Sequence, residues 1–225
     1  MNTEEKDLLA RCSRMGASTW SDALDACGIA GVLQGIERRA GQGIAAGFAA
    51  TARHAVGAPG SFERSDFAVG KLVAATGPGR VLMVDIGGAP ISTFGGLASM
   101  AAVARQAAGV VIDGACRDVD EIRACGLTMA SRWVAPTTGK TRLQLQSMGE
   151  PVTVGGIRVN EGDLVVIDDT GTVVVPRGAL PQVLEASERI QAVDAAVEKA
   201  IRQGRSFGEA AAAANYIPLP AAGGS

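Results

Sequence analysis

The sequence predicts a mixed α/β fold in which a parallel central layer is joined to an antiparallel unit and a long C-terminal helix. Two observations predict it. In the middle of the chain, short apolar runs alternate with helical segments, an order typical of parallel strands joined by right-handed crossovers. After Pro151, Val- and Ile-rich runs follow one another across short turns, which is typical of antiparallel hairpins. The 225 residues suit one domain with a small helical appendage.

The N-terminal part predicts two helices before the first strand. Residues 3–15 are expected to form a surface helix, and a second helix is expected from about Ser18 to Gly28. Thr19 and Asp22 have the spacing of a capping box, which indicates where the second helix begins. A strand of small residues and a loop complete this part, over 46–55 and 57–70.

The middle of the chain predicts three buried strands separated by two helices. Strands of a parallel sheet are covered on both faces, so they are apolar throughout instead of alternating, and the runs RVLMVDI and GVVID have this character. The five expected elements are a strand over 80–86, a helix over 95–107, a strand over 109–113, a helix over 118–125 and a strand over 128–134.

The C-terminal third predicts a hairpin followed by a long helix. The turn Asp168-Asp169-Thr170-Gly171 connects two Val/Ile runs, and the helix is expected from about Leu180 to Gln203. From Ala211 the chain is expected to fray. The expected division is an N-terminal helix, a core, C-terminal helices and a flexible tail, over residues 1–17, 18–178, 179–215 and 216–225.

Composition excludes several classes of protein. The 21 Lys and Arg nearly balance the 23 Asp and Glu, so the clustered basic surface that nucleic-acid binding requires is not expected. A hydrophobic share of 47% excludes intrinsic disorder. No apolar stretch approaches the roughly 18 residues of a membrane span. The charged N-terminal segment lacks the pattern of a secretory signal, so a cytoplasmic protein without nucleic-acid or membrane partners is expected.

Several familiar motifs of catalysis fail on inspection. Gly139-Lys140-Thr141 resembles the end of a phosphate-binding loop, but position 134 is Val where that motif requires Gly. His54 is the single histidine and is expected to have a structural or surface role. Lys71 and Lys140 are more often solvated lysines than Schiff-base nucleophiles, and Lys140 is better suited to attract an anion.

The informative segment is the run over residues 109–122. It places Arg117 and Asp118 just beyond the carboxyl end of a buried parallel strand, where open α/β sheets hold their ligands. A structural interpretation stays open beside the functional one. Asp118 and Glu121 also have the spacing of a helix-capping box, and Arg117 could pair with a nearby acid.

The run VVIDGACRDVDEI resembles the signature of the RraA-like proteins, which include divalent-metal-dependent 4-hydroxy-4-methyl-2-oxoglutarate aldolases and oxaloacetate decarboxylases. SDALD, GFAAT and the late block GGIRVNEGDLVVIDD agree with it, so that the resemblance covers roughly residues 18–210. It implies a swivelling β/β/α fold with a mixed sheet and a C-terminal helix, and a homotrimer or homohexamer.

The resemblance also implies the roles of individual residues. Asp118 would coordinate Mg²⁺ or Mn²⁺ with water in most other positions, and Arg117 would grip the carboxylate and carbonyl of a 2-oxo acid. The backbone N–H groups of Leu97 and Ala98, which open the helix after Gly95-Gly96, would bind the same carboxylate. The turn over 85–88 is expected to line the same pocket.

One position departs from the family pattern. Family aldolases usually carry an acid 21 positions before the arginine, and this position is Gly96. Aldol cleavage needs a base for the 4-hydroxyl proton, whereas decarboxylation does not. The sequence therefore predicts a higher activity on oxaloacetate than on 4-hydroxy-4-methyl-2-oxoglutarate. Restoring the acid with Gly96→Asp is the complementary test.

A further acid is expected from the C-terminal helix of a neighbouring subunit, at Asp194 or, one turn later, Glu198. Two alternatives remain beside the metal-dependent lyase. The family's namesake inhibits the endoribonuclease RNase E by protein–protein contact, so a non-catalytic binding protein is possible. The other alternative is a lyase for a different 4-substituted 2-oxo acid, for which Gly96 makes room.

Overall fold

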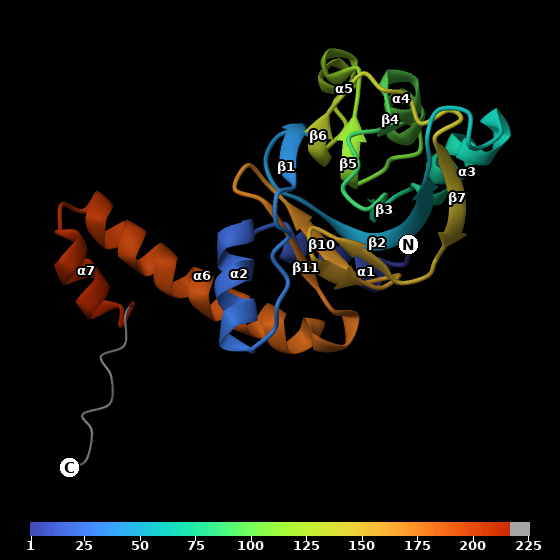
Figure 1. The fold of residues 1–225 in the computed structure, drawn as a ribbon. Helices are drawn as coiled ribbons and strands as arrows, with labels where there is room; N and C mark the ends of the chain where they lie inside the picture. The colour runs from blue at the N-terminus through green and yellow to red at the C-terminus, as the bar shows by residue number, and fades with distance from the viewer. Residues whose placement is uncertain (217–225) are drawn as a thin grey trace, which may run out of the picture.

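A long curved strand, β2 (Ala45–Val56), connects the parts of the sheet (Figure 1). The computed structural model describes residues 1–216. In these residues nine strands form one sheet in the order β1-β6-β5-β3-β2-β10-β11, with β4 beside β5 and β7 beside β2. The start of β2 pairs with β10, its middle with β3 and its end with β7. The predicted combination of parallel and antiparallel pieces is confirmed.

The parallel layer is buried on both faces, as its apolar runs predict. It consists of β2, β3 (Arg80–Asp85), β5 (Gly109–Cys116) and β6 (Met129–Val134). Leu82 and Ile112 point toward helices and belong to one core cluster, whereas Met83 and Val111 belong to the cluster on the opposite face. The helices that cover the first face are α3 (Val69–Ala75), α4 (Gly96–Ala104) and α5 (Val119–Cys125).

The other face of the parallel layer packs against the antiparallel unit. Val154, Val165 and Val174 enter this cluster from β8 (Val152–Val154), β10 (Leu164–Ile167) and β11 (Thr172–Val175). β8 forms a separate two-stranded sheet with β9 (Ile157–Val159). The predicted hairpin is confirmed, because β10 and β11 pair antiparallel with Ile167 opposite Thr172.

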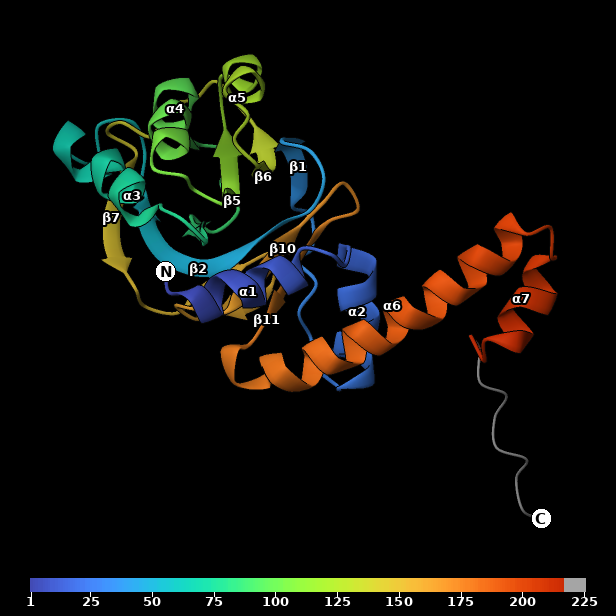
Figure 2. The ribbon, with the colours of Figure 1, turned by 180° about the vertical axis from the view of Figure 1, so that it is seen from behind.

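Three helices cover the outer face of the antiparallel unit (Figure 2). They are α1 (Thr3–Cys12), α2 (Ala17–Ala26) and the first half of α6 (Leu180–Arg202), and Trp20, Leu24 and Val183 are buried among them. The capping box expected at Thr19 and Asp22 is wrong. The helix begins two residues earlier, and its first N–H, on Ala17, donates to the carboxylate of Asp168 at 2.7 Å.

The second half of α6 and α7 (Phe207–Ala213) extend away from the body as an arm (Figures 1 and 2). Val197 of α6 is buried, and α6 packs against α7 in this arm. The expectation that the chain frays from Ala211 is wrong, because α7 continues to Ala213 and Ala211 is buried. The ring of Tyr216 stacks edge-on against Phe207 with centroids 5.9 Å apart. The rest of the expected flexible tail, 217–225, lies outside the described residues.

Several elements differ from the sequence prediction. The segment 57–70, expected as a loop, contains a 3₁₀ turn at Arg64–Phe67 and leads directly into α3. Three further strands of the main sheet are unpredicted: β1 (Glu37–Ala40), β4 (Ser92–Phe94) and β7 (Leu143–Met148). Among residues 1–216, no helix has the length and apolar character needed to cross a membrane.

Candidate functional site

Two neighbouring parallel strands bring the candidate residues together. β4 pairs with the end of β5, with Ser92 opposite Ala115 and Phe94 opposite Cys116. Both strands therefore end at the same edge of the sheet, and each leads into a helix: β4 through Gly95 into α4, and β5 through the segment 117–118 into α5. This edge is where α/β sheets bind ligands.

Asp118 connects the two strand–helix junctions. Its backbone is left-handed, with φ +57°, and its side chain does not cap α5, so the capping-box interpretation is wrong. Instead, its Oδ2 accepts a hydrogen bond from the N–H of Gly96 at 3.1 Å, at the start of α4. The carboxylate is 37% exposed. No bond within residues 1–216 engages its Oδ1, which leaves that oxygen available to a ligand.

Arg117 is anchored through its backbone, while its guanidinium stays accessible. Its N–H donates to the carbonyl of Phe94 at 3.0 Å, which fixes the residue beside β4. Its Nε lies 3.5 Å from Oδ2 of Asp118, a loose ion pair, and the side chain is 39% exposed. The planar donors of the guanidinium are therefore free to bind a carboxylate.

The first turn of α4 presents backbone donors beside these side chains. Gly96 donates to Asp118, and Ser99 begins the intrahelical bonds by donating to Gly95. Within the described chain, no hydrogen bond uses the N–H groups of Leu97 and Ala98. Such groups at the positive end of a helix favour an anion.

A cavity of about 340 Å³ contains these groups together. The structure brings six of the seven candidate residues to its wall, and adds three side chains of different character, Phe67, Glu121 and Lys140. Lys140 follows Gly139 in a loop that approaches the cavity closely. An ideal Cβ on Gly139 would lie 2.6 Å from Cε2 of Phe67 and 2.8 Å from the carbonyl oxygen of Ser92, so only glycine fits at this position. The six candidates are Gly95, Gly96, Leu97, Ala98, Arg117 and Asp118.

The space above Gly96 is filled, so the expectation that this glycine makes room for a substrate is wrong. An ideal Cβ on Gly96 would lie 1.6 Å from Oε2 of Glu121. From its spacing alone, Glu121 is expected only as a capping residue. The sequence offers one signal for it, the position of Glu121 in the first turn of the helix that begins directly after Asp118.

The turn over 85–88 does not line this cavity, contrary to expectation. Asp85 holds its own turn, because its Oδ1 accepts from the N–H of Gly87 at 2.9 Å, and its Oδ2 accepts from the N–H of Thr153 at 3.2 Å. The turn is kept away from the cavity because β4 lies beyond the end of β3 and pairs with the last residues of β5.

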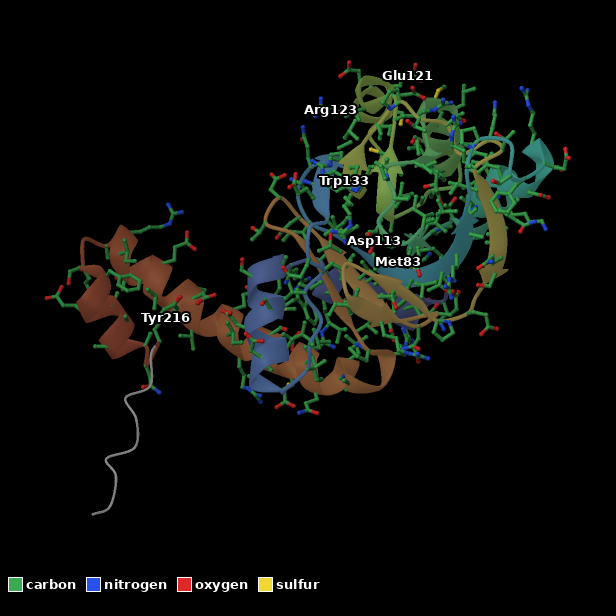
Figure 3. The ribbon with its side chains drawn as sticks, in the orientation of Figure 1. Met83, Asp113, Glu121, Arg123, Trp133 and Tyr216 are labelled. Carbon is green, nitrogen blue, oxygen red and sulfur yellow. The ribbon has the colours of Figure 1, made fainter. Side chains whose placement is uncertain are left out.

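Asp194 lies in a different cavity of the same chain, lined by Asp22, Ile190 and Tyr216 among others. Tyr216 and Glu121, which mark the two cavities, lie at opposite ends of the molecule (Figure 3). Burial raises the pKa of Asp194 above its ordinary value, and the nearby charge of Asp22 adds to this. The fallback residue Glu198 pairs with Arg202 at 2.6 Å.

His54 lies in the core. It is 4% exposed, and its Nε2 lies 3.2 Å from the carbonyl of Phe67. Burial lowers the pKa of the imidazole, and the bond to this carbonyl opposes that change. The expectation of a structural role is consistent with this position, one layer behind the cavity wall that Phe67 forms.

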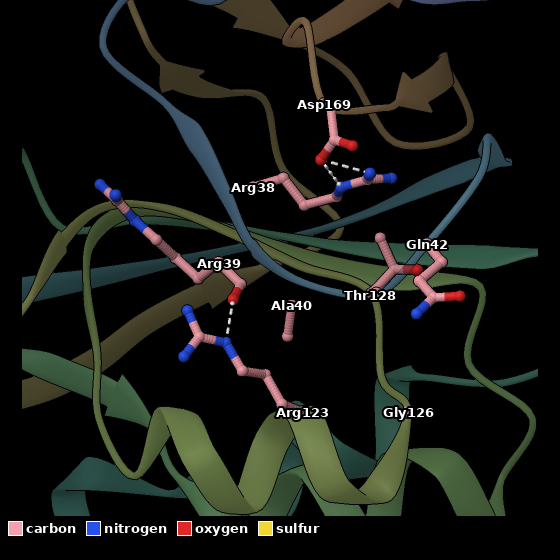
Figure 4. A pocket seen from close by; sticks show the side chains of 9 residues that line it. Arg38, Arg39, Ala40, Gln42, Arg123, Gly126, Thr128 and Asp169 are labelled. Atoms are coloured by element: carbon pink, nitrogen blue, oxygen red, sulfur yellow. Dashed lines mark hydrogen bonds and ion pairs between the residues drawn. The ribbon is translucent and has the colours of Figure 1, made fainter.

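A larger cavity of about 730 Å³ lies between β1 and α5, and its arginines are engaged in structure (Figure 4). Arg38 pairs with Asp169, and Nε of Arg123 donates to the carbonyl of Arg39. None of the candidate residues lies there.

Comparisons with known proteins agree with this architecture. The model of the RraA-like family, described as Aldolase/RraA, matches residues 17–174. A protein of Halalkalibacterium halodurans named "Putative 4-hydroxy-4-methyl-2-oxoglutarate aldolase" is 28% identical over 202 residues, which are 89% of this chain and 91% of that protein.

Two other relatives are matched over less of their own length. An uncharacterized protein of Methanocaldococcus jannaschii is 33% identical over 116 residues, 52% of this chain and 55% of that protein. Protein DlpA of Legionella pneumophila is 26% identical over 206 residues, 91% of this chain and 33% of that protein. The chain thus spans about half of the first and a third of the second.

Solved structures share the fold. An uncharacterized protein from Pseudomonas syringae pv. tomato superposes with a TM-score of 0.80 at 27% identity, over 91% of this chain and 96% of that one. RraAS2 of Streptomyces coelicolor, titled an unusual member of the RNase ES inhibitor RraA protein family, superposes with a TM-score of 0.72 at 26% identity, over 80% and 91%. The family model spans more than two thirds of the sequence, and the chain belongs to the RraA-like family.

Proposed function

We propose that the cavity at the ends of β4 and β5 binds a small 2-oxo acid, and that the protein is a divalent-metal-dependent carbon–carbon lyase. The observation that carries this proposal is the convergence of Arg117, Asp118 and the free N–H groups of α4 in one cavity. Relatives named as aldolases support a lyase of this general kind. The reaction class is oxaloacetate decarboxylation, cleavage of 4-hydroxy-4-methyl-2-oxoglutarate, or both.

The donor set of the cavity fits a hard divalent cation. Oδ1 of Asp118 is free of bonds within residues 1–216, and its exposed carboxylate leaves space for water. In the same residues, no group of three or more His, Cys, Asp or Glu side chains is arranged to hold a metal. Mg²⁺ accepts one or two carboxylates with several waters, because it dehydrates reluctantly. Asp118 would hold the ion, which supplies Lewis-acid stabilisation of a substrate oxyanion when bound.

The remaining chemistry belongs to the side chains and backbone of the chain. Both reactions pass through the enolate of pyruvate, so negative charge develops on the C2 oxygen. Arg117 binds the carboxylate and this oxygen, where a fixed guanidinium stabilises the charge. The N–H groups of Leu97 and Ala98 orient the same carboxylate. Lys140, exposed at the cavity wall, attracts the second carboxylate of a dicarboxylic substrate.

Pyruvate release tests the proposal. The wild-type protein is expected to release pyruvate from oxaloacetate or 4-hydroxy-4-methyl-2-oxoglutarate with Mg²⁺ or Mn²⁺, and to lose this activity with EDTA. Arg117→Met is expected to lower kcat/KM by at least about 10²-fold, the loss typical of removing one oxyanion-stabilising donor. Full activity in this variant, or in the presence of EDTA, would contradict the proposal.

The similarity to RraAS2 supports a second candidate, an inhibitor of an RNase E-type enzyme. The two candidates are separated by one comparison. Tight binding to RNase E with no turnover of any 2-oxo acid would favour the inhibitor. Turnover of a different 4-substituted 2-oxo acid alone would retain the lyase and change its substrate.

A further inference from the structure

Gly95 and Gly96 form a backbone cradle for charged side chains. An ideal Cβ on Gly95 would lie 2.5 Å from Oδ2 of Asp118 and 3.1 Å from Nε of Arg117. An ideal Cβ on Gly96 would lie 1.6 Å from Oε2, 2.7 Å from Cδ and 2.9 Å from Cβ of Glu121. The side chain of Glu121 therefore lies along the first turn of α4, in the place of a side chain that Gly96 lacks.

Glu121 is exposed, and no residue of the described chain holds its carboxylate. Its carboxylate makes no hydrogen bond or ion pair in residues 1–216, although its neighbour Asp120 pairs with Arg123 at 3.6 Å. The capping role is excluded, because Asp118 is left-handed and α5 has no side-chain cap. A free carboxylate thus lines the same cavity as Arg117 and the open donors of α4.

Aldol cleavage requires a proton acceptor at such a place. Resting on the proposed function, we propose that Glu121 is the general base for the C4 hydroxyl of a 4-hydroxy-2-oxo acid. The carboxylate of Glu121 takes the hydroxyl proton, C4 becomes a carbonyl, and the C3–C4 bond breaks. The electron pair of that bond forms the enolate, with its charge on the C2 oxygen beside Arg117. The proton then returns to C3 and yields pyruvate, so nothing is oxidised or reduced.

Decarboxylation makes a different demand on the same cavity. Oxaloacetate has no C4 hydroxyl, and its C3–C4 bond breaks to release CO₂ and the same enolate. Glu121 has no proton to accept in that bond cleavage. Comparing the two substrates therefore distinguishes two roles for Glu121. Loss of a general base lowers only the aldol activity, whereas loss of a residue that supports the fold, the metal or Arg117 lowers both activities together.

The test compares Glu121→Gln with the wild type on both substrates at saturating Mn²⁺. The variant is expected to lose about 10²- to 10⁴-fold in kcat on 4-hydroxy-4-methyl-2-oxoglutarate, the usual contribution of general-base catalysis. Its kcat on oxaloacetate and its Mn²⁺ affinity, measured by electron paramagnetic resonance without substrate, are expected to stay near wild type. Asp120→Asn, one residue earlier on the same helix and fully exposed, is the matched control and is expected to change neither activity.

A parallel loss on both substrates, or unchanged aldol cleavage, would overturn the assignment. A large fall in Mn²⁺ affinity would overturn it too, since Glu121 would then be a metal ligand. Failure of the proposed function has a different result, because the wild type would cleave neither substrate.

Moving the carboxylate provides a rescue experiment. Gly96→Asp alone is expected to impair aldol cleavage, because its Cβ collides with the side chain of Glu121. The pair Gly96→Asp with Glu121→Ala returns a carboxylate to the same space and is expected to recover at least about tenfold over Glu121→Ala. Gly96→Ala with Glu121→Ala is the control without a carboxylate, and equal recovery in that pair would contradict the role of a base.

Discussion

Asp118 holds its position in the candidate site at the expense of backbone strain. A left-handed backbone costs an L-residue about 1–2 kcal/mol, but Asn and Asp tolerate it better than residues such as Ala. Asp118→Asn is therefore expected to keep the melting temperature while removing the charge that a cation needs. We expect turnover and Mn²⁺ binding to be lost. Asp118→Ala is expected to lose turnover and also about 1–2 kcal/mol of stability. Thermal melts beside turnover measure both, and an active Asn variant would contradict the metal-ligand role.

His54 gives the protein a dependence of stability on pH. Burial lowers the pKa of the folded-state imidazole, so the unfolded chain binds a proton more readily as the pH falls past the ordinary value of about 6.5. The free energy of unfolding is thus expected to decrease between about pH 7.5 and 5.5, by at most about 1.4 kcal/mol per pH unit. Urea denaturation at several pH values measures the slope. His54→Gln should reduce the slope of the unfolding free energy against pH, since the sequence has no other histidine. An unchanged slope would mean that other titratable groups cause the pH dependence.

At the scale of single residues, the sequence located the candidate residues where position alone was informative. Arg117 and Asp118 follow a buried strand, and this sufficed to place them at the ligand-binding edge. Glu121 was missed because its spacing from Asp118 satisfies a capping box, which accounts for both residues without a ligand. The structure excludes that box through the left-handed backbone of Asp118, and this angle comes from tertiary structure.

At the scale of elements, the hairpin turn and α2 stabilise each other through Asp168. Its Oδ2 accepts from the N–H of Ala17, while its Oδ1 accepts from the N–H groups of Thr170 and Gly171. Asp168→Ala is expected to lose about 1–2 kcal/mol, the usual cost of an N-cap. At this chain length each kcal/mol lowers the melting temperature by about 2–4 °C. Thr170→Ala is the control, because it keeps the backbone N–H that donates to Asp168 and removes only an exposed side chain.

Elements with a strong intrinsic pattern were predictable, and those created by pairing were not. β3 and β5 were predictable because each is a continuous apolar run. β4 has three residues, too few for any periodicity, and exists because it pairs with the end of β5. β1 is rich in charge and lies at the sheet edge beside β6, where its Arg and Glu side chains remain partly solvated. Such strands are set by their neighbours more than by their own composition.

At the scale of the whole molecule, the position of Asp194 bears on assembly. Asp194 lies in the arm-side cavity, away from Arg117 of its own chain, so a catalytic role requires a neighbouring subunit. We expect Arg117→Met and Asp194→Asn each to be inactive alone. In a ring of subunits, mixing the two after reversible dissociation is expected to restore about a quarter of wild-type activity, because random assembly leaves about one site in four intact. If mixing restores no activity, each active site is formed within one chain.

The curved strand β2 also determines how the molecule comes apart. Its twelve residues pair with segments that begin about 35, 100 and 120 positions later in the chain, so its partners come from both the parallel and the antiparallel layers. If this strand leaves, β3, β7 and β10 each lose a hydrogen-bonded partner, and the two layers are no longer joined through the sheet. The two layers should therefore lose structure in a single cooperative step, and the amide protons at the centre of β2 should exchange with solvent only when the whole protein unfolds.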